Sequence, residues 1–231
     1  MAIHIATLAK APYLWIRRAV ADTLFERRYD VRTSPVIELD ELGIPAHERI
    51  RYQATGWLNL PRILPAREVG PHDVFVDFGS GMGRVVLQAA TRYPCKKVIG
   101  VELSGRLVGI ARANVARNAH RLRCAEVSFV ESDALDYEIP DDMTIAFFHN
   151  PFTGSIFARV LQRIVESVDR APRTVRVVYV NPVEERALLE TGRARVVRRL
   201  RGMRPTAEWS RSNSTRMYEI TPRAIGHGVA G

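Results

Sequence analysis

Short apolar runs alternate with stretches of helical periodicity along most of this chain, beginning at Asp73. The apolar runs predict strands near residues 74–77, 97–102, 126–131, 143–148, 174–180, 194–201 and 215–220. Apolar positions at helical spacing predict helices near residues 83–93, 104–119, 153–168 and 183–191. Parallel neighbouring strands need a long crossover, usually a helix, so this alternation predicts an α/β fold with a doubly wound, mostly parallel sheet.

The first part of the chain has a different pattern. Apolar residues at a fourfold spacing predict an amphipathic helix within residues 1 to about 30, namely Leu8, Ile16, Val20 and Leu24. We expect it to cover the active-site end of the main domain, and binding to a membrane surface is the alternative. Residues 31–50 read as a linker with little regular structure, and a short helical pattern from Leu58 to Leu64 leads into the core.

Three glycines at alternating positions follow the first strand, at 79, 81 and 83. A strand that breaks into a glycine turn and then a helix lets a ligand approach bare backbone and unpaired N–H groups. The dinucleotide fingerprint would place its third glycine at position 84, where this chain has Arg84. Glu102 ends the next strand, where a carboxylate can accept hydrogen bonds from paired ribose hydroxyls.

The run from Asp77 to Gly83, together with Glu102, resembles the first motifs of the class I, Rossmann-like S-adenosylmethionine (SAM) methyltransferases. Within that class, Tyr52, Thr55 and the stretch 76–88 are similar to bacterial relatives of the non-SET histone-lysine methyltransferases. The resemblance implies a seven-stranded sheet whose last strand is antiparallel, and SAM as the cofactor. It divides the chain into an N-terminal helical extension or lid (1–65), a SAM-binding methyltransferase domain (66–222) and a flexible tail (223–231).

The same resemblance implies a set of cofactor-binding residues. They are Tyr52, Thr55, Asp77, Gly79, Ser80, Gly81, Gly83, Glu102, Asp133, Ala134 and Asn150. Asp133 follows the third strand, at the edge where open α/β sheets bind ligands, and would accept a hydrogen bond from the adenine amino group. Ala134 would offer its backbone N–H to the adenine ring. The alternative for Asp133 is that it only caps a following turn.

The fourth strand runs into Asn150-Pro151-Phe152, which is similar to the Asn-Pro-Pro-aromatic motif of amine methyltransferases but lacks the second proline. The Asn150 side-chain oxygen and the following backbone carbonyl would accept the two N–H bonds of an amine and aim its lone pair at the methyl group. The Phe152 ring would stabilise the positive charge that develops on nitrogen. We therefore predict these three residues as the catalytic set, with a purely structural turn as the alternative.

Other residues near the same rim have weaker signals. Strand alternation would place His149 and Asn150 on opposite faces, which predicts a buried, hydrogen-bonded His149 rather than a general base. Further pocket walls are predicted from aromatic and amide residues nearby, namely Trp57, Tyr179, Asn181 and Trp209.

Composition narrows the class of protein. Its 46% hydrophobic and 26% charged content is typical of a globular protein, and no apolar run approaches the ~18–20 residues that cross a bilayer. The N-terminus lacks a signal-peptide layout, so a cytoplasmic protein without a membrane partner is the default. Two cysteines are too few for a disulfide framework or metal knuckle, and no aspartates follow the fourth strand, so no metal is predicted.

The formal net charge is +9, but only three of the basic residues are lysines, so no nucleic-acid partner is predicted and the charge leaves one only as an alternative. An arginine cluster at 193–204 reads as a solvated edge or as a surface for an anionic partner. We therefore predict a SAM-dependent methyltransferase that transfers a methyl group to an amine nitrogen of a small molecule or of a peptide or protein side chain. The alternatives are O-methyl transfer on the same fold and a non-catalytic SAM-fold binding protein.

Overall fold

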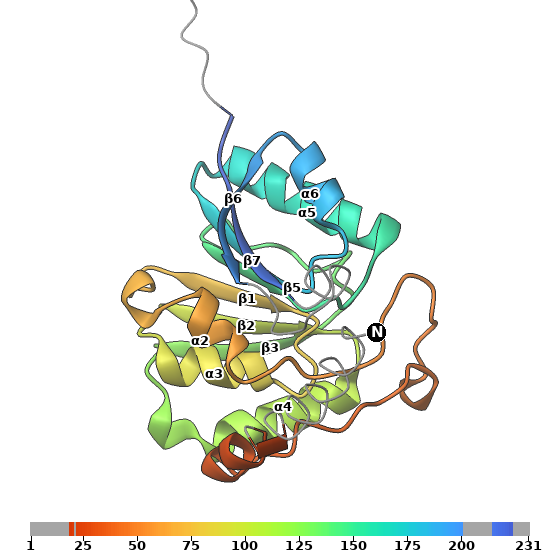
Figure 1. Cartoon of the computed structure of the whole chain (residues 1–231), viewed down its shortest axis with the longest axis vertical. Helices are drawn as coiled ribbons and strands as arrows, with labels where there is room; N and C mark the ends of the chain where they lie inside the picture. Colours follow the sequence, from red (N-terminus) through yellow and green to blue (C-terminus); the bar gives the residue numbers. More distant parts are fainter. Residues whose placement is uncertain (1–18, 21, 201–213, 224–231) are drawn as a thin grey trace, which may run out of the picture.

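A seven-stranded sheet with helices on both faces forms the centre of the molecule (Figure 1). The computed structural model describes residues 19–20, 22–200 and 214–223. Its strands are β1 (Val74–Phe78), β2 (Lys97–Glu102), β3 (Glu126–Glu131), β4 (Ile145–Phe148), β5 (Val175–Val180), β6 (Ala194–Leu200) and β7 (Thr215–Ile220). Its α-helices within the described residues include α2 (Asn59–Ile63), α3 (Arg84–Arg92), α4 (Gly105–Arg117), α5 (Gly154–Arg170) and α6 (Glu185–Glu190). Every strand and helix predicted from residue 73 onward is present.

The strand order is β3-β2-β1-β4-β5-β7-β6, with β7 antiparallel to both of its neighbours. The predicted doubly wound sheet with an antiparallel last strand is therefore confirmed. The order reverses at β1, which pairs in parallel with β2 on one side and with β4 on the other. Ligands bind outside the carboxyl ends of the strands at such a switch point. This geometry places the site at the ends of β1, β2 and β4.

The sheet has a hydrophobic core on each face, and β1 contributes to both. Val74, Val76 and Phe78 pack into the core that contains the apolar side of α5, whereas Phe75 packs into the core that contains α3. All five residues of β1 are buried. A strand covered on both faces reads as a continuous apolar run, which is why β1 was clear in the sequence.

The N-terminal segment packs through different residues from those predicted. Residues 22–29 are helical, but Val20 and Leu24 are 51% and 62% exposed. Leu8 and Ile16 lie outside the described residues. Phe25 and Tyr29 instead stack on the Trp57 ring, each with a centroid distance of 5.4 Å. The predicted apolar face was wrong for Val20 and Leu24, because the helix packs on the core through the rings of Phe25 and Tyr29 against Trp57.

Arg84 joins this segment to the sheet, and its side chain is only 2% exposed. Its guanidinium donates to Thr33 Oγ1 (2.7 Å), Asp22 Oδ1 (3.1 Å), the Thr55 carbonyl (2.9 Å), Glu26 Oε1 (3.0 Å) and Ser34 Oγ (2.8 Å). It also lies 4.9 Å from the centre of the Trp57 ring. A buried cation is tolerated only when its donors are paired in this way. Arg84, at the start of α3, therefore ties together parts of the chain between residues 22 and 57.

Burial alone would raise the pKa of Glu26, but hydrogen bonds from Thr33 and Ser34 and the charge of Arg84 outweigh it. The pKa of Glu26 is therefore lowered, and its contribution to stability is present at neutral pH. That contribution is lost as the pH falls through the lowered pKa of the folded protein.

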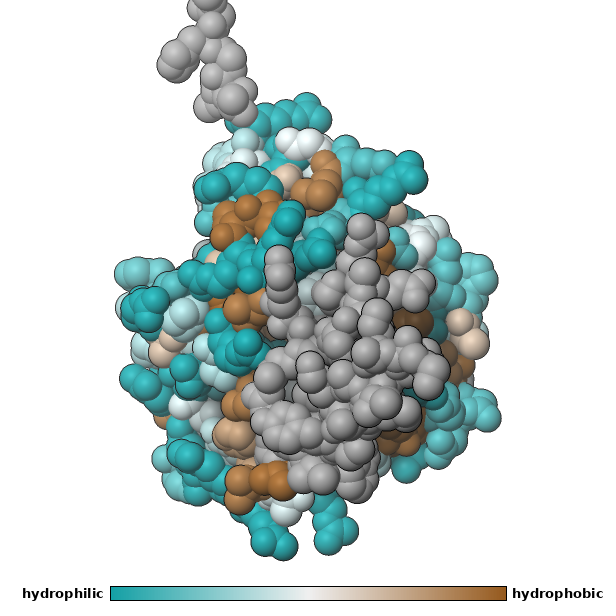
Figure 2. All heavy atoms as spheres, viewed as in Figure 1, coloured by the Kyte–Doolittle hydropathy of each residue, from teal (hydrophilic) through white to brown (hydrophobic). Residues whose placement is uncertain are grey.

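The outer surface is mainly hydrophilic in the view of Figure 2, with scattered hydrophobic residues between charged ones. In the part of the chain that the structure describes, no helix is long and apolar enough to cross a membrane. The described arginines of the cluster at 193–204 are largely engaged with carboxylates. Arg193 pairs with Asp169 (2.6 Å), Arg198 pairs with Glu68 (2.9 Å), and Arg195 pairs with Glu219. Arg201 and Arg204 lie outside the described residues.

We predict that Arg84→Met lowers the free energy of unfolding by about 3–5 kcal/mol, because it leaves two largely buried carboxylates without a cation. For a chain of this size the expected loss in Tm is roughly 10 °C. Thermal and urea unfolding followed by circular dichroism will measure it. Arg186→Gln, which removes an exposed i,i+4 pair with Glu190, is the matched control and should leave Tm unchanged. A loss under ~1 kcal/mol for Arg84→Met would contradict the role given to this residue.

Candidate active site

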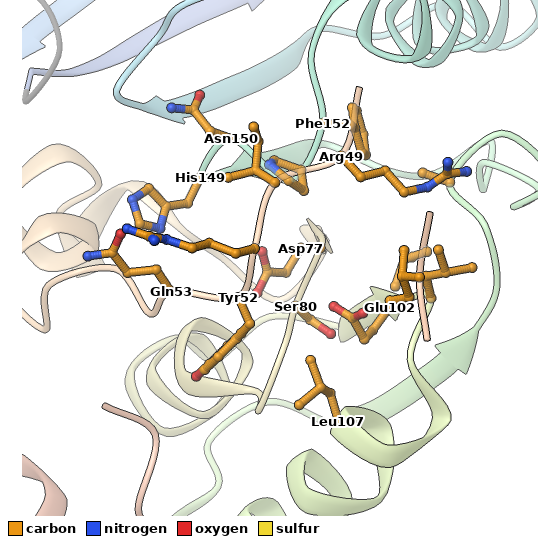
Figure 3. Close-up of a pocket in the computed structure, with 18 of the residues that line it drawn as sticks. Arg49, Tyr52, Gln53, Asp77, Ser80, Glu102, Leu107, His149, Asn150 and Phe152 are labelled. Carbon is orange, nitrogen blue, oxygen red and sulfur yellow. The ribbon is translucent and has the colours of Figure 1, made fainter. Parts of the chain in front are cut away.

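A pocket opens at the carboxyl ends of β1, β2 and β4 and is covered by residues from the segment 39–55 (Figure 3). The predicted site residues that line it are Tyr52, Thr55, Asp77, Gly79, Ser80, Glu102, Asp133, Ala134, Asn150, Pro151 and Phe152. Gly81 and Gly83 do not line it. Gly83, with φ +77°, faces Ala111 and belongs to the contact between α3 and α4. The fold therefore gathers in one pocket most of the site residues that the sequence predicted, although they are far apart in the chain.

The glycine turn after β1 allows two other walls of the pocket to come close. Gly79 has φ +77°, and a Cβ atom built there would lie 2.2 Å from Pro151 Cβ. Gly81 has φ +54°, and a Cβ atom there would lie 2.2 Å from the Tyr52 ring. A larger residue at either position would be strained and would also push its neighbour away. The glycine turn thus positions both the Asn150-Pro151 turn and residues 39–55, the covering segment.

Two carboxyl groups, those of Asp77 and Glu102, line the floor of the pocket. Asp77, only 3% exposed, has a pKa well above its usual range, chiefly because it is buried and also because Glu102 repels its charge. Burial likewise raises the pKa of Glu102, although its two oxygens accept hydrogen bonds from the backbone N–H groups of Gly81 and Ser104, both at 2.9 Å. Such a pair favours a ligand that brings positive charge or hydroxyl donors.

Asp133 uses both carboxylate oxygens within the protein. Oδ1 accepts from the Leu135 backbone N–H at 2.9 Å, which is the turn-capping contact considered from the sequence. Oδ2 accepts from Arg49 Nη2 at 2.5 Å. Arg49 lines the pocket but was missed by the sequence analysis, because nothing in its local pattern separates it from the chain's many other arginines. Each oxygen retains a second lone pair, so Asp133 can still accept a hydrogen bond from a ligand.

The covering segment is held in place by strand-like pairing with the turn after β4. Arg49 forms an antiparallel bridge with Phe152, and the Ile50 N–H donates to the Pro151 carbonyl at 3.1 Å. The Glu48 carboxylate accepts from the Ser155 hydroxyl (2.6 Å) and the Ile156 N–H (3.1 Å) at the start of α5, and these bonds lower its pKa. Residues 31–50 have little regular structure, as predicted, but they are a wall of the pocket and not a free linker.

Tyr52 and Thr55 anchor the other end of this segment. The Tyr52 hydroxyl donates to the Thr33 carbonyl at 2.7 Å, and Thr55 Oγ1 accepts from Asn59 Nδ2 at 3.0 Å. Both residues line the pocket, whereas the described helical residues 22–29 do not. The part of the N-terminal extension that covers the site is therefore the irregular segment, not this helix.

The turn after β4 differs in one respect from the predicted alternation. The strand ends at Phe148 and Asn150 has φ +47°, so the alternating pattern stops before these positions. Both His149 and Asn150 line the pocket, although their side chains point in different directions (Figure 3). His149 is half-buried and lies beside Gln53, whereas the Asn150 amide points away from Asp77 (Figure 3).

The remaining aromatic predictions separate into core and pocket. Phe152 is buried, packs edge-on against Phe148 at 6.1 Å and still lines the pocket. Trp57 and Tyr179 do not line it: Trp57 lies under Arg84, and Tyr179 packs against Phe157. Asn181 does not line it either but directly follows β5, and Trp209 lies outside the described residues.

Among the described residues, no three His, Cys, Asp or Glu side chains gather so as to hold a metal ion.

Comparison with known proteins gives three kinds of match. Residues 55–144 match the family described as Histone methylation protein DOT1. A histone-lysine N-methyltransferase, H3 lysine-79 specific, from Caenorhabditis elegans is 45% identical over 53 residues, which are 23% of this chain and 6% of that protein. A protein-lysine N-methyltransferase from Saccharolobus islandicus is 29% identical over 87 residues, 38% of this chain and 52% of that protein.

Among solved structures, the precorrin 8w decarboxylase from Methanobacterium thermoautotrophicum aligns with a TM-score of 0.53 and 22% identity, over 73% of this chain and 92% of that one. The chain has the class I, Rossmann-like methyltransferase fold. The recognition made from the glycine motif and Glu102 is thereby confirmed, and with it SAM as the cofactor of the family. The chain spans about half or less of the curated relatives that it matches, and the structural likeness shows the fold alone.

We predict that Asp77→Asn raises the Tm of the ligand-free protein at neutral pH. No described residue donates a hydrogen bond that would offset burial of the Asp77 charge, so the neutral amide removes a cost. Because the pKa of Asp77 is raised on folding, its cost is full above that pKa and disappears below the ordinary carboxyl pKa. The gain in Tm should therefore shrink as the pH falls from about 8 to about 4.

Thermal melts across this pH range will measure the effect. Asp136→Asn, at an exposed position near the same edge of the sheet, is the control and should give no trend. A lower Tm for Asp77→Asn at neutral pH would contradict the prediction.

Proposed function

We propose that this chain is a SAM-dependent methyltransferase that methylates an amine nitrogen, and more narrowly the side-chain amine of a lysine in a protein. The observation that carries the proposal is the contact between Pro151 and Gly79, since it places the Asn150 turn directly against the glycine turn of the cofactor pocket. An amine bound at this turn would therefore lie next to the methyl donor.

The pocket residues fit SAM in charge and in hydrogen bonding. Glu102 would accept hydrogen bonds from the ribose hydroxyls, and Asp133 with Ala134 would hold the adenine. Asp77 favours positive charge beside it, and Ser80 Oγ is buried with no partner among the described residues, as expected of a group that meets a ligand. SAM supplies an electrophilic methyl group on a sulfonium. The roles of Tyr52 and Thr55 are to cover the cofactor from the side opposite the sheet.

Most of the rate enhancement would come from positioning. Asn150 would accept an N–H bond of the neutral amine and hold its lone pair in line with the methyl group, and Phe152 would lie near the charge that develops on nitrogen. Residues 48–52 of the covering segment would exclude water through their pairing with residues 151–153. The choice of lysine rests on the names of the relatives and on the matching family, whose matched segment covers the glycine turn, Glu102 and Asp133.

The proposal predicts that the purified protein transfers tritium from methyl-labelled SAM to protein in a cell extract. A matched extract whose lysine amines have been blocked by acetylation should lose the label, because an amide nitrogen has no lone pair available for methyl transfer. Nuclease treatment should leave it in place. Labelling of the blocked extract would contradict lysine, and label that nuclease removes would indicate nucleic acid instead.

The cofactor half can be tested by itself. We predict that Glu102→Gln weakens S-adenosylhomocysteine binding by about 10-fold or more, because a neutral amide is a poorer acceptor for two hydroxyls. Isothermal titration calorimetry will measure the Kd. Glu131→Gln is the matched control, since Glu131 is the register partner of Glu102 on β3 but is exposed and does not line the pocket. Equal affinities for wild type and Glu102→Gln would contradict the ribose assignment.

A further inference from the structure

Two neighbouring strands end in the same dipeptide. Asn150-Pro151 follows β4, and Asn181-Pro182 follows β5. The two strands are parallel and Phe148 is the register partner of Tyr179, so the asparagines come two residues later at equivalent positions. Both have left-handed backbone, with φ +47° at Asn150 and +56° at Asn181. Non-glycine residues in this conformation carry strain, and strain of this kind clusters at functional sites.

The side chains of both asparagines have an unused acceptor. Asn150 Oδ1 and Asn181 Oδ1 are each buried and have no hydrogen-bond partner among the described residues. The backbone of Asn181 is fully engaged, since its N–H donates to the Ser214 carbonyl and its own carbonyl accepts from the Val183 N–H, both at 2.8 Å. The backbone from which its side chain projects is therefore held at a fixed place. A buried acceptor without a donor is destabilising, so this corner is suited to a ligand that brings N–H groups.

The second acceptor expected from the sequence motif is already in use. The Pro151 carbonyl accepts the Ile50 N–H at 3.1 Å as part of the pairing that closes the covering segment. An amine that reacts through its lone pair has two N–H bonds to be held. Asn150 accounts for one of them. Asn181 does not line the pocket itself, but it follows β5 at the position equivalent to Asn150 after β4, and its acceptor is unused.

We propose that Asn150 and Asn181 together form the binding site for the acceptor amine, and that Asn181 makes this site selective for primary amines. The inference rests on the proposed function and specifies its substrate class. With both N–H bonds accepted, the nitrogen lone pair forms the N–CH₃ bond as the S–CH₃ bond breaks. S-adenosylhomocysteine leaves, and the new alkylammonium releases one proton to solvent. A methylated amine has only one N–H bond for the two acceptors, so one methyl transfer per amine is the preferred outcome.

A binding experiment tests this site without requiring turnover. n-Butylamine is titrated into the full chain with S-adenosylhomocysteine present, and ¹H–¹⁵N spectra follow the side-chain amides, which are assigned with single variants. The amide signals of both Asn150 and Asn181 should shift on the same binding curve, whereas 1-butanol should shift neither to the same extent. Asn181→Gly removes the acceptor and suits the left-handed backbone, so it should weaken butylamine binding about tenfold with the Kd of S-adenosylhomocysteine unchanged.

Turnover gives the second measurement. Asn181→Gly should raise KM for the lysine substrate and increase the share of dimethylated product, and Asn181→Asp, which keeps an acceptor, should retain binding of the amine. Unshifted Asn181 signals, or equal butylamine affinity for wild type and Asn181→Gly, would overturn the inference even if wild type methylates lysine. Butylamine binding at both amides without methylation of any extract would leave the amine site standing and refute the proposed function.

Discussion

The buried guanidinium of Arg84 is the interaction on which the arrangement of the site depends. It begins α3 directly after the glycine turn, and it binds both helical residues 22–29 and the segment that leads to Tyr52 and Thr55. Residues on the covering segment have almost no regular structure to hold them. Their position over the pocket instead comes from one cation and from short pairings at 37–52 and 49–152. Arg84, which stands where the dinucleotide fingerprint has its third glycine, thus also holds the covering segment over the pocket.

The centre of the sheet could be predicted from the sequence because its strands are buried on both faces. Strands such as β1 and β4 are continuous apolar runs, and the glycine turn and Glu102 identify the edge where a ligand binds. The N-terminal helix was harder, since spacing alone cannot show that Phe25 and Tyr29 stack on Trp57 while Val20 and Leu24 face solvent. Contacts between segments far apart in the chain leave no local pattern.

The candidate site was predictable in its parts on the sheet and not in its parts on loops. Asp77, Glu102 and Asp133 come at strand ends, where position follows from topology. Arg49 and its pairing with Asp133 depend on a loop whose path nothing local dictates. His149 shows a further limit, because the alternation of a strand ends where the strand does. The strand ends at Phe148 and Asn150 has left-handed backbone, so alternation cannot place the side chains of His149 and Asn150.

The strand order places β1, β2 and β3 on one side of the pocket and β4 and β5 on the other, so the two sides come from successive parts of the chain. The family match runs from residue 55 to 144 and contains β1, β2 and β3 with the turns after them, which hold most of the residues that we propose for the cofactor. The match stops one residue before β4, so Asn150 and Asn181, which we propose bind the acceptor amine, lie beyond it. A chimera joined at residue 144 would therefore keep most of the residues that we propose for the cofactor and would replace those that we propose for the acceptor amine.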